Sequence, residues 1–367
     1  MKCRMFALLG ALLCATALAA QTRIAISAGT PEDKDLQTIS AESDAQKRAT
    51  LLGEFVVKYA GNASAVALGN AQLSQIAAAS GDSARALALG DKALAAMPDL
   101  IEVLQSQADI AQQAKLYDKV VDYAARGAAA IRALQQQPKP ARQSSEDWAA
   151  ELVQQKQSLQ PTYAYFEAAA YNSTAAENDP ATRLAMVQRF LQAFPGSQFS
   201  HQASALAILS LQESKDTARL VSFGDQAVAA NPNDAALRIV LANALSESPG
   251  YEAKASGYAR QAIELAKNAS DAETRKAAGV GHSIVGYVLL KQNKAALAVP
   301  ELKTATSLLQ DDPDALAAAW FRLGFAYAKL EQATNALAAL NKAAAIPGPY
   351  QQPAQDIIAK IKAARKK

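Results

Sequence analysis

The feature that most constrains this chain is a 34-residue unit that runs from residue 317 to residue 350. Its first half repeats residues at the three- and four-residue spacing of one helix face, namely Trp320, Leu323, Gly324 and Tyr327. Its second half does the same with smaller residues ahead of Pro347, namely Ala336, Leu340 and Ala343. The pattern predicts two facing helices, whose glycine and alanine let the axes approach to about 8–9 Å.

This unit resembles the tetratricopeptide repeat, in which W-x2-L-G-x2-Y marks the first helix and A-x3-F, Ala and Pro mark the second. The resemblance implies an all-α protein, built as an α-solenoid of antiparallel helix pairs in a right-handed superhelix. Alanine is the commonest residue of the chain, and it recurs where such helix pairs cross. It is also the strongest helix former, which supports the same fold class.

Weaker copies of the unit precede it. In the nearest copy Gly286 takes the glycine position, and Pro300 falls inside the second helix, where a proline kinks a helix or costs about 3 kcal/mol. A longer repeat is also present, because residues 48–62 resemble residues 183–197 at an offset of 135. We therefore expect a module of about three helix pairs to occur twice. The alternative is chance similarity between alanine-rich helices.

These patterns divide the chain into six segments. Gln21 to Asp35 has the composition of a loose tail, and Pro161 is expected to start a new helix after a linker rich in Gln, Pro and Ser. The predicted segments are a signal peptide (1–20), an N-terminal tail and first helix (21–45), a first module (46–132), a linker and connecting helix (133–160), a second module (161–350) and a C-terminal capping helix (351–367).

The first twenty residues have the layout of a secretory signal peptide, with a basic start, an apolar run over residues 5–13 and then small residues. The run is shorter than the roughly 20 residues that a membrane-spanning helix needs. We expect cleavage near Ala19 or Ala20 and export to a bacterial periplasm or the medium. An uncleaved anchor and a lipid attached at Cys14 are the alternatives.

Removal of this leader would change the chemistry of the chain. Both cysteines, Cys3 and Cys14, would be lost, which excludes disulfides, thiolate metal sites and cysteine nucleophiles. The formal net charge would fall from +3 to +1 with the loss of Lys2 and Arg4. Such a chain has no electrostatic footprint for nucleic acid, so no nucleic-acid partner is expected.

The sequence predicts a chain without catalytic, metal or cofactor sites. His201 and His282 lie in different repeats and form no H-E-x-x-H sequence. Ser283 follows Gly281 in a near match to G-x-S-x-G, but it lies on a predicted helix and the second glycine comes one residue late. The acidic residues 311–314 lack the spacing of a calcium loop and precede a helix, where aspartate is favoured as a cap.

A concave groove is the predicted functional surface, because stacked helix pairs curve and their first helices line the inner face. Repeats of the resembled family often bind peptides there. Besides Ser283, the C-terminal part of the groove is predicted to present Tyr287, Lys291, Phe321, Phe325 and Lys329. These aromatic rings and ammonium groups suit a peptide with apolar anchors and an acidic group. Alternatively, the rings pack against the next repeat or the capping helix.

Two further patterns concern the partner. Some members of the resembled family hold a C-terminal carboxylate with a paired Lys and Asn, but here only Asn243 fits and Ile239 replaces the Lys. The groove of the first module is predicted to be polar and acidic, with Glu102, Gln105 and Asp109.

We therefore expect a non-catalytic, exported scaffold that mediates protein–protein interactions in the periplasm. Its partner is a protein or peptide, and membrane association is compatible with this reading without being required. The alternative is an accessory of cell-envelope or outer-membrane biogenesis or of secretion, because residues 55–59 and 190–197 resemble helix ends in envelope lipoproteins of this repeat class. An enzyme is the least favoured alternative.

Overall fold

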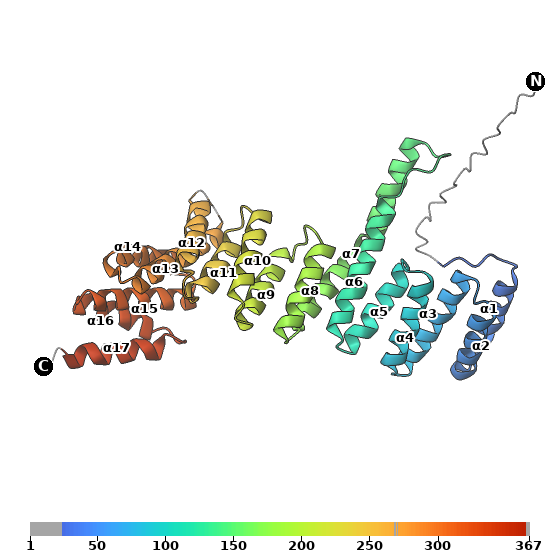
Figure 1. The fold of residues 1–367 in the computed structure, drawn as a ribbon, viewed down its shortest axis with the longest axis horizontal. Helices are drawn as coiled ribbons and strands as arrows, with labels where there is room; N and C mark the ends of the chain where they lie inside the picture. Colours follow the sequence, from blue (N-terminus) through green and yellow to red (C-terminus); the bar gives the residue numbers. More distant parts are fainter. Residues whose placement is uncertain (1–23, 268, 270, 365–367) are drawn as a thin grey trace, which may run out of the picture. The chain divides into compact units, whose positions relative to one another are not determined.

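The computed structural model describes residues 24–267, 269 and 271–364, and every regular element in these ranges is an α-helix (Figure 1). The predicted all-α class is therefore confirmed. The predicted signal peptide, with both cysteines, lies outside the described residues. Within the described ranges, no helix has both the length and the apolar character that a membrane crossing needs.

The chain divides into two units, and each has its own packing. The first unit comprises the described residues up to 176 together with 189–197, and the second comprises 177–188 and the residues from 198 onward. The helices of the first unit are α1 (Pro31–Ala41), α2 (Ala45–Lys58), α3 (Ala63–Ala79), α4 (Ser83–Ala96), α5 (Ile101–Gln113), α6 (Tyr117–Gln135) and α7 (Ser145–Ala176).

Helix α8 (Pro180–Ala193) begins in the second unit and ends in the first. The remaining helices belong to the second unit, and they are α9 (Ser200–Glu213), α10 (Thr217–Ala230), α11 (Ala235–Ser246), α12 (Glu252–Ala266), α13 (Ala272–Lys291), α14 (Ala295–Leu308), α15 (Pro313–Lys329), α16 (Ala333–Ala344) and α17 (Gln351–Ala364).

Consecutive helices pack as antiparallel hairpins within each unit (Figure 1). In the second unit the first helices of successive hairpins, α9, α11, α13 and α15, also contact one another. In the first unit α5 contacts α7 in the same way. Contact between successive hairpins along one direction is the arrangement of an α-solenoid.

Glycines mark the points where helices of a hairpin approach most closely. A Cβ on Gly324 of α15 would lie 2.5 Å from the Cγ of Leu340 in α16, and a Cβ on Gly286 of α13 would lie 2.5 Å from the Cγ of Leu302 in α14. Any larger residue would push the partner helix away, so the glycines set the interhelical distance. Helix α14 continues through Pro300, as the repeat pattern predicted.

The sequence resemblance between residues 48–62 and 183–197 has a counterpart in local structure at the starts of α2 and α8, while the duplication of a whole module stays a prediction. Before α2, Glu42 Oε1 accepts a hydrogen bond from the Asp44 backbone N–H at 2.8 Å. Asp44 then caps α2, and Arg48 Nη1 donates to the Glu42 carbonyl oxygen at 3.1 Å.

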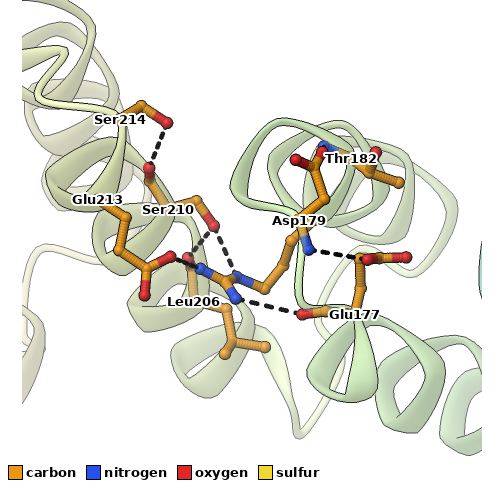
Figure 2. A network of polar contacts seen from close by, with 8 residues as sticks. Glu177, Asp179, Thr182, Leu206, Ser210, Glu213 and Ser214 are labelled. Atoms are coloured by element: carbon orange, nitrogen blue, oxygen red, sulfur yellow. Dashed lines mark hydrogen bonds and ion pairs between the residues drawn. The ribbon is translucent and has the colours of Figure 1, made fainter.

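The residues 135 positions later make the same contacts (Figure 2). Glu177 Oε1 accepts from the Asp179 N–H at 2.9 Å, and Arg183 Nη1 donates to the Glu177 carbonyl oxygen at 3.2 Å. Arg183 additionally donates from Nε to Ser210 Oγ at 2.8 Å and pairs with Glu213, so it joins the start of α8 to α9.

The prediction of a new helix starting at Pro161 is wrong. Helix α7 runs unbroken from Ser145 to Ala176 with Pro161 inside it. Pro161 and Gln157 are both exposed. The Gln157 carbonyl, which loses its N–H partner at a proline four residues on, can therefore bond to water.

The units also divide at a place other than the predicted linker over 133–160. Later turns of α7 pack on α6, where a Cβ on Gly127 would lie 2.3 Å from the ring of Phe166. The first unit therefore extends through α7 to residue 176. Similarly, the predicted tail ends early, because Thr30 caps α1 and the helix begins at Pro31.

Candidate functional site

A pocket of about 350 Å³ lies among the first helices of successive hairpins in the second unit. We call it the Arg322 pocket. It combines aliphatic side chains with a few polar groups, and it is lined by Gln212, Ile239, Val240, Asn243, Val280, Ser283, Leu309, Asp314, Ala315, Ala318, Arg322 and Tyr350.

Helix caps position the two helices that supply the polar centre of this pocket. Asp271 caps α13, and its Oδ1 accepts the Thr274 N–H at 2.7 Å. Asp312 caps α15, its Oδ1 accepts the Ala315 N–H at 3.0 Å, and Pro313 is the first helical residue. These caps fix the residue at which each helix begins, and thereby which side chains of the helix face the pocket.

Arg322 is the cation of the pocket. Its Nη1 donates to Ser283 Oγ at 2.9 Å, and its guanidinium carbon lies 4.7 Å from the centre of the Tyr287 ring. Burial lowers the pKa of Arg322, because desolvation disfavours the charged form. No carboxylate of the described residues forms an ion pair with it. The pocket therefore holds a partly buried positive charge that contacts a hydroxyl and an aromatic ring. Glu247 lies close enough to act on this charge, and Asp314 is part of the pocket lining.

Two of the predicted groove residues, both on α13, have hydrogen-bond partners at the C-terminal end of α11. The Tyr287 hydroxyl donates to Glu247 at 3.0 Å, and its ring lies beside Arg322. Lys291 donates to the Ser246 carbonyl at 2.8 Å. None of the five predicted binding residues lines the Arg322 pocket, although Tyr287 supports its cation.

The other three predicted groove residues lie toward the C-terminal end. The Phe321 ring lies 5.4 Å from the ring of Tyr350, so it packs on the following segment as the alternative reading held. Phe325 is 38% exposed, and Lys329 lies over its ring and donates to Asn293. A binding role for these side chains stays a prediction.

Sequence reasoning missed Arg322 and Tyr350 as members of the site. Arg322 occupies a variable position of the W-x2-L-G pattern, next to Phe321, where the pattern assigns no role. The spacing along the helix could have indicated its place. Arg322 lies four residues before the buried Ala326 and next to the buried Leu323, which places it at the border of the inner face. The pocket also includes three residues that the sequence patterns point to, Ser283, Asn243 and Ile239.

The predicted packing residues lie in the cores between helices. Leu323, Tyr327 and Ala336 belong to one buried cluster that also includes Leu302, and Trp320 packs against it. Ala343 belongs to a second cluster, which α17 covers with Ala354 and Ile358.

The histidines and the acidic run have structural partners. His201 Nδ1 lies 2.8 Å from Asp234 and His282 Nδ1 lies 2.6 Å from Glu301. Within the described ranges, no group of histidines, cysteines and acids is arranged to hold a metal ion.

These features define the class of the protein, which is an all-α solenoid of antiparallel helix pairs. In the hairpins α13–α14 and α15–α16, a glycine of the first helix lies against a leucine of the second, and the pocket is lined mainly by the first helices of successive hairpins. No protein-family model matches the sequence, and neither does any curated protein.

Similar solved structures include the TPR domain of P58(IPK), 13% identical, which covers 92% of this chain and 99% of that chain with a TM-score of 0.33. They also include the Cut9–Hcn1 hetero-tetramer of the APC/C, 13% identical, which covers 92% of this chain and 91% of that chain with a TM-score of 0.28. The class rests on the helix pairs themselves.

Proposed function

We propose that this protein is a non-catalytic, exported scaffold that binds a protein partner through the Arg322 pocket. A tetratricopeptide-type solenoid presents an inner face suited to peptides and helices, which supports a role in protein interactions. The observation that carries the proposal is the partly buried guanidinium of Arg322, which donates to Ser283 in the pocket and forms no ion pair with a carboxylate of the described residues.

The chemistry of the pocket favours a partner with an acidic group. A guanidinium binds a carboxylate through two parallel hydrogen bonds, and burial strengthens that pairing. Aliphatic side chains from three elements, Ile239, Val280 and Leu309, surround the charge. A peptide carboxylate next to an aliphatic residue therefore fits the pocket.

The place of action that we propose is the bacterial periplasm, on the basis of the leader-like first twenty residues. Membrane fractionation separates this proposal from an envelope-attached accessory. A soluble periplasmic pool supports the former, and recovery in the membrane fraction alone supports the latter.

The test is quantitative affinity capture from the native envelope with three mature chains. Arg322→Gln removes the charge and keeps a polar side chain of similar length. Arg219→Gln is the matched control, because Arg219 is 65% exposed on α10. A partner captured by the unaltered chain and by Arg219→Gln, and lost with a folded Arg322→Gln chain, supports the proposal. Recovery of the same proteins with all three chains refutes it.

A further inference from the structure

The segment before α1 is extended, and its side chains alternate between two environments. Ile24 and Ile26 are partly buried, whereas Ala25 and Ser27 are exposed. Ile26 packs against the buried core that α1, α2 and α3 share. The first unit thus already holds one extended segment through every second side chain, which is how a strand-like peptide presents its side chains.

Ile24 lies at one end of a groove between α3 and α5. There it lines a pocket of about 230 Å³, whose other apolar residues are Leu68, Ala71 and Val103. The polar residues of this pocket are Gln72, Ser74, Gln75, Glu102, Ser106 and Gln107. We call this surface the α3–α5 groove.

The groove continues toward α7. A second pocket of about 560 Å³ shares Glu102 with the first and is lined mainly by α5 and α7. It includes Gln155, whose buried amide oxygen has no hydrogen-bond donor among the described residues. An acceptor of this kind favours a ligand that brings N–H groups, such as a peptide backbone.

The charge of the groove is negative. Glu102 and Glu151 line it, and no described lysine or arginine lines either pocket. A ligand segment with a basic residue complements these carboxylates. In the sequence, Arg23 directly precedes Ile24, so this chain carries a segment of the complementary type.

We propose that the α3–α5 groove is a second protein-binding surface, which takes an aliphatic side chain of a peptide segment in the place that Ile24 holds, with a basic residue beside it. Ile26 of the same segment packs next to the groove, on the core that α1, α2 and α3 share. The segment around Ile24 and Ile26 is its resident occupant, and a partner binds by displacing it. Within residues 24–27, Ile24 and Ile26 are the partly buried side chains, so this described part opens more readily than the helix pairs. The proposal concerns the first unit and is independent of the Arg322 pocket.

The test uses a fluorescent peptide with the sequence of residues 21–29 and the full mature chain. The variant Ile24→Ser/Ile26→Ser vacates the groove. In the unaltered chain the tethered segment competes at an effective concentration on the order of mM. We therefore expect the vacated chain to bind the peptide at least about tenfold more tightly, as measured by fluorescence anisotropy. The matched control, Ala25→Ser/Ser27→Ala, changes the two exposed neighbours and should bind like the unaltered chain.

Two further substitutions, each added to the Ile24→Ser/Ile26→Ser chain, test whether the peptide binds in the groove. Leu68→Glu should abolish it, and Glu102→Gln should weaken it several-fold and reduce its dependence on salt. A chain that begins at Ala28 is the second vacated form, should the double variant fail to fold by circular dichroism. Equal binding by vacated and unaltered chains, no binding by either vacated form, or binding that survives Leu68→Glu would overturn the proposal.

Discussion

Replacing Gly324 by alanine tests whether this glycine sets the distance between α15 and α16. The added Cβ would lie 2.5 Å from the Leu340 Cγ, 2.8 Å from its Cδ2 and 3.1 Å from its backbone nitrogen. Leu340 is fully buried, so its side chain has little room to move. The backbone nitrogen recedes only if α16 moves as a whole.

Two opposing effects decide how much Gly324→Ala changes the free energy of unfolding. Alanine in place of glycine inside a helix contributes about 0.5–1 kcal/mol through its helix propensity. Overpacking of a filled core costs about 1–3 kcal/mol. Because the clash involves backbone as well as side chain, we expect it to dominate, with a net loss of about 1–2 kcal/mol in the free energy of unfolding. For a unit of this size that corresponds to a decrease of about 2–8 °C in Tm.

Differential scanning calorimetry measures the effect, and Gly257→Ala is the matched control. Gly257 lies inside α12, and a Cβ there would meet no atom within 4 Å. Alanine at this position should leave Tm unchanged or raise it, through propensity alone. Gly324→Leu should be less stable than Gly324→Ala. If the Tm of Gly324→Ala equals or exceeds the Tm of Gly257→Ala, Gly324 does not set the distance between α15 and α16.

Two other sets of contacts lead to predictions about stability. Asp234 raises the pKa of His201 through a hydrogen bond, so their pairing stabilises the fold fully below the unfolded pKa of about 6.5 and is lost as pH rises through the folded pKa. His201→Gln should therefore lower Tm at about pH 5.5 and have no effect at about pH 9; an equal loss at both pH values would contradict this. Arg183→Ala should cost about 2–3 kcal/mol in urea denaturation, because its charge-assisted hydrogen bonds lie in a nearly buried site. Arg48→Ala, which loses the equivalent bond to Glu42, should cost less, and equal losses would count against this assignment.

The helix pairs could be predicted because their signals are local and recur. Gly286 and Gly324 occupy the same position of the repeat, and each meets a leucine of the next helix sixteen residues on. Helix caps such as Asp44 and Asp179 are equally local, so the likeness of these two helix starts could be recognised from the residues around them.

Boundaries and site membership were less accessible to sequence reasoning. A proline such as Pro161 is compatible with a helix start or a helix interior, and its exposure in the folded chain decided between them. Ile24 and Ile26 lie before α1 in a stretch with the composition of a loose tail. Their packing against the neighbouring helices is seen only in the tertiary structure.

The sequence by itself determined the helices, their pairing and the close crossings, since each depends on residues within one repeat. The tertiary structure decided which side chains share a pocket. Arg322 and Ser283 are 39 residues apart and belong to different hairpins, so their hydrogen bond exists only once the hairpins stack. The stacking also partly buries Arg322 among aliphatic side chains, and this placement, rather than the residue type, makes its charge a candidate for binding a partner.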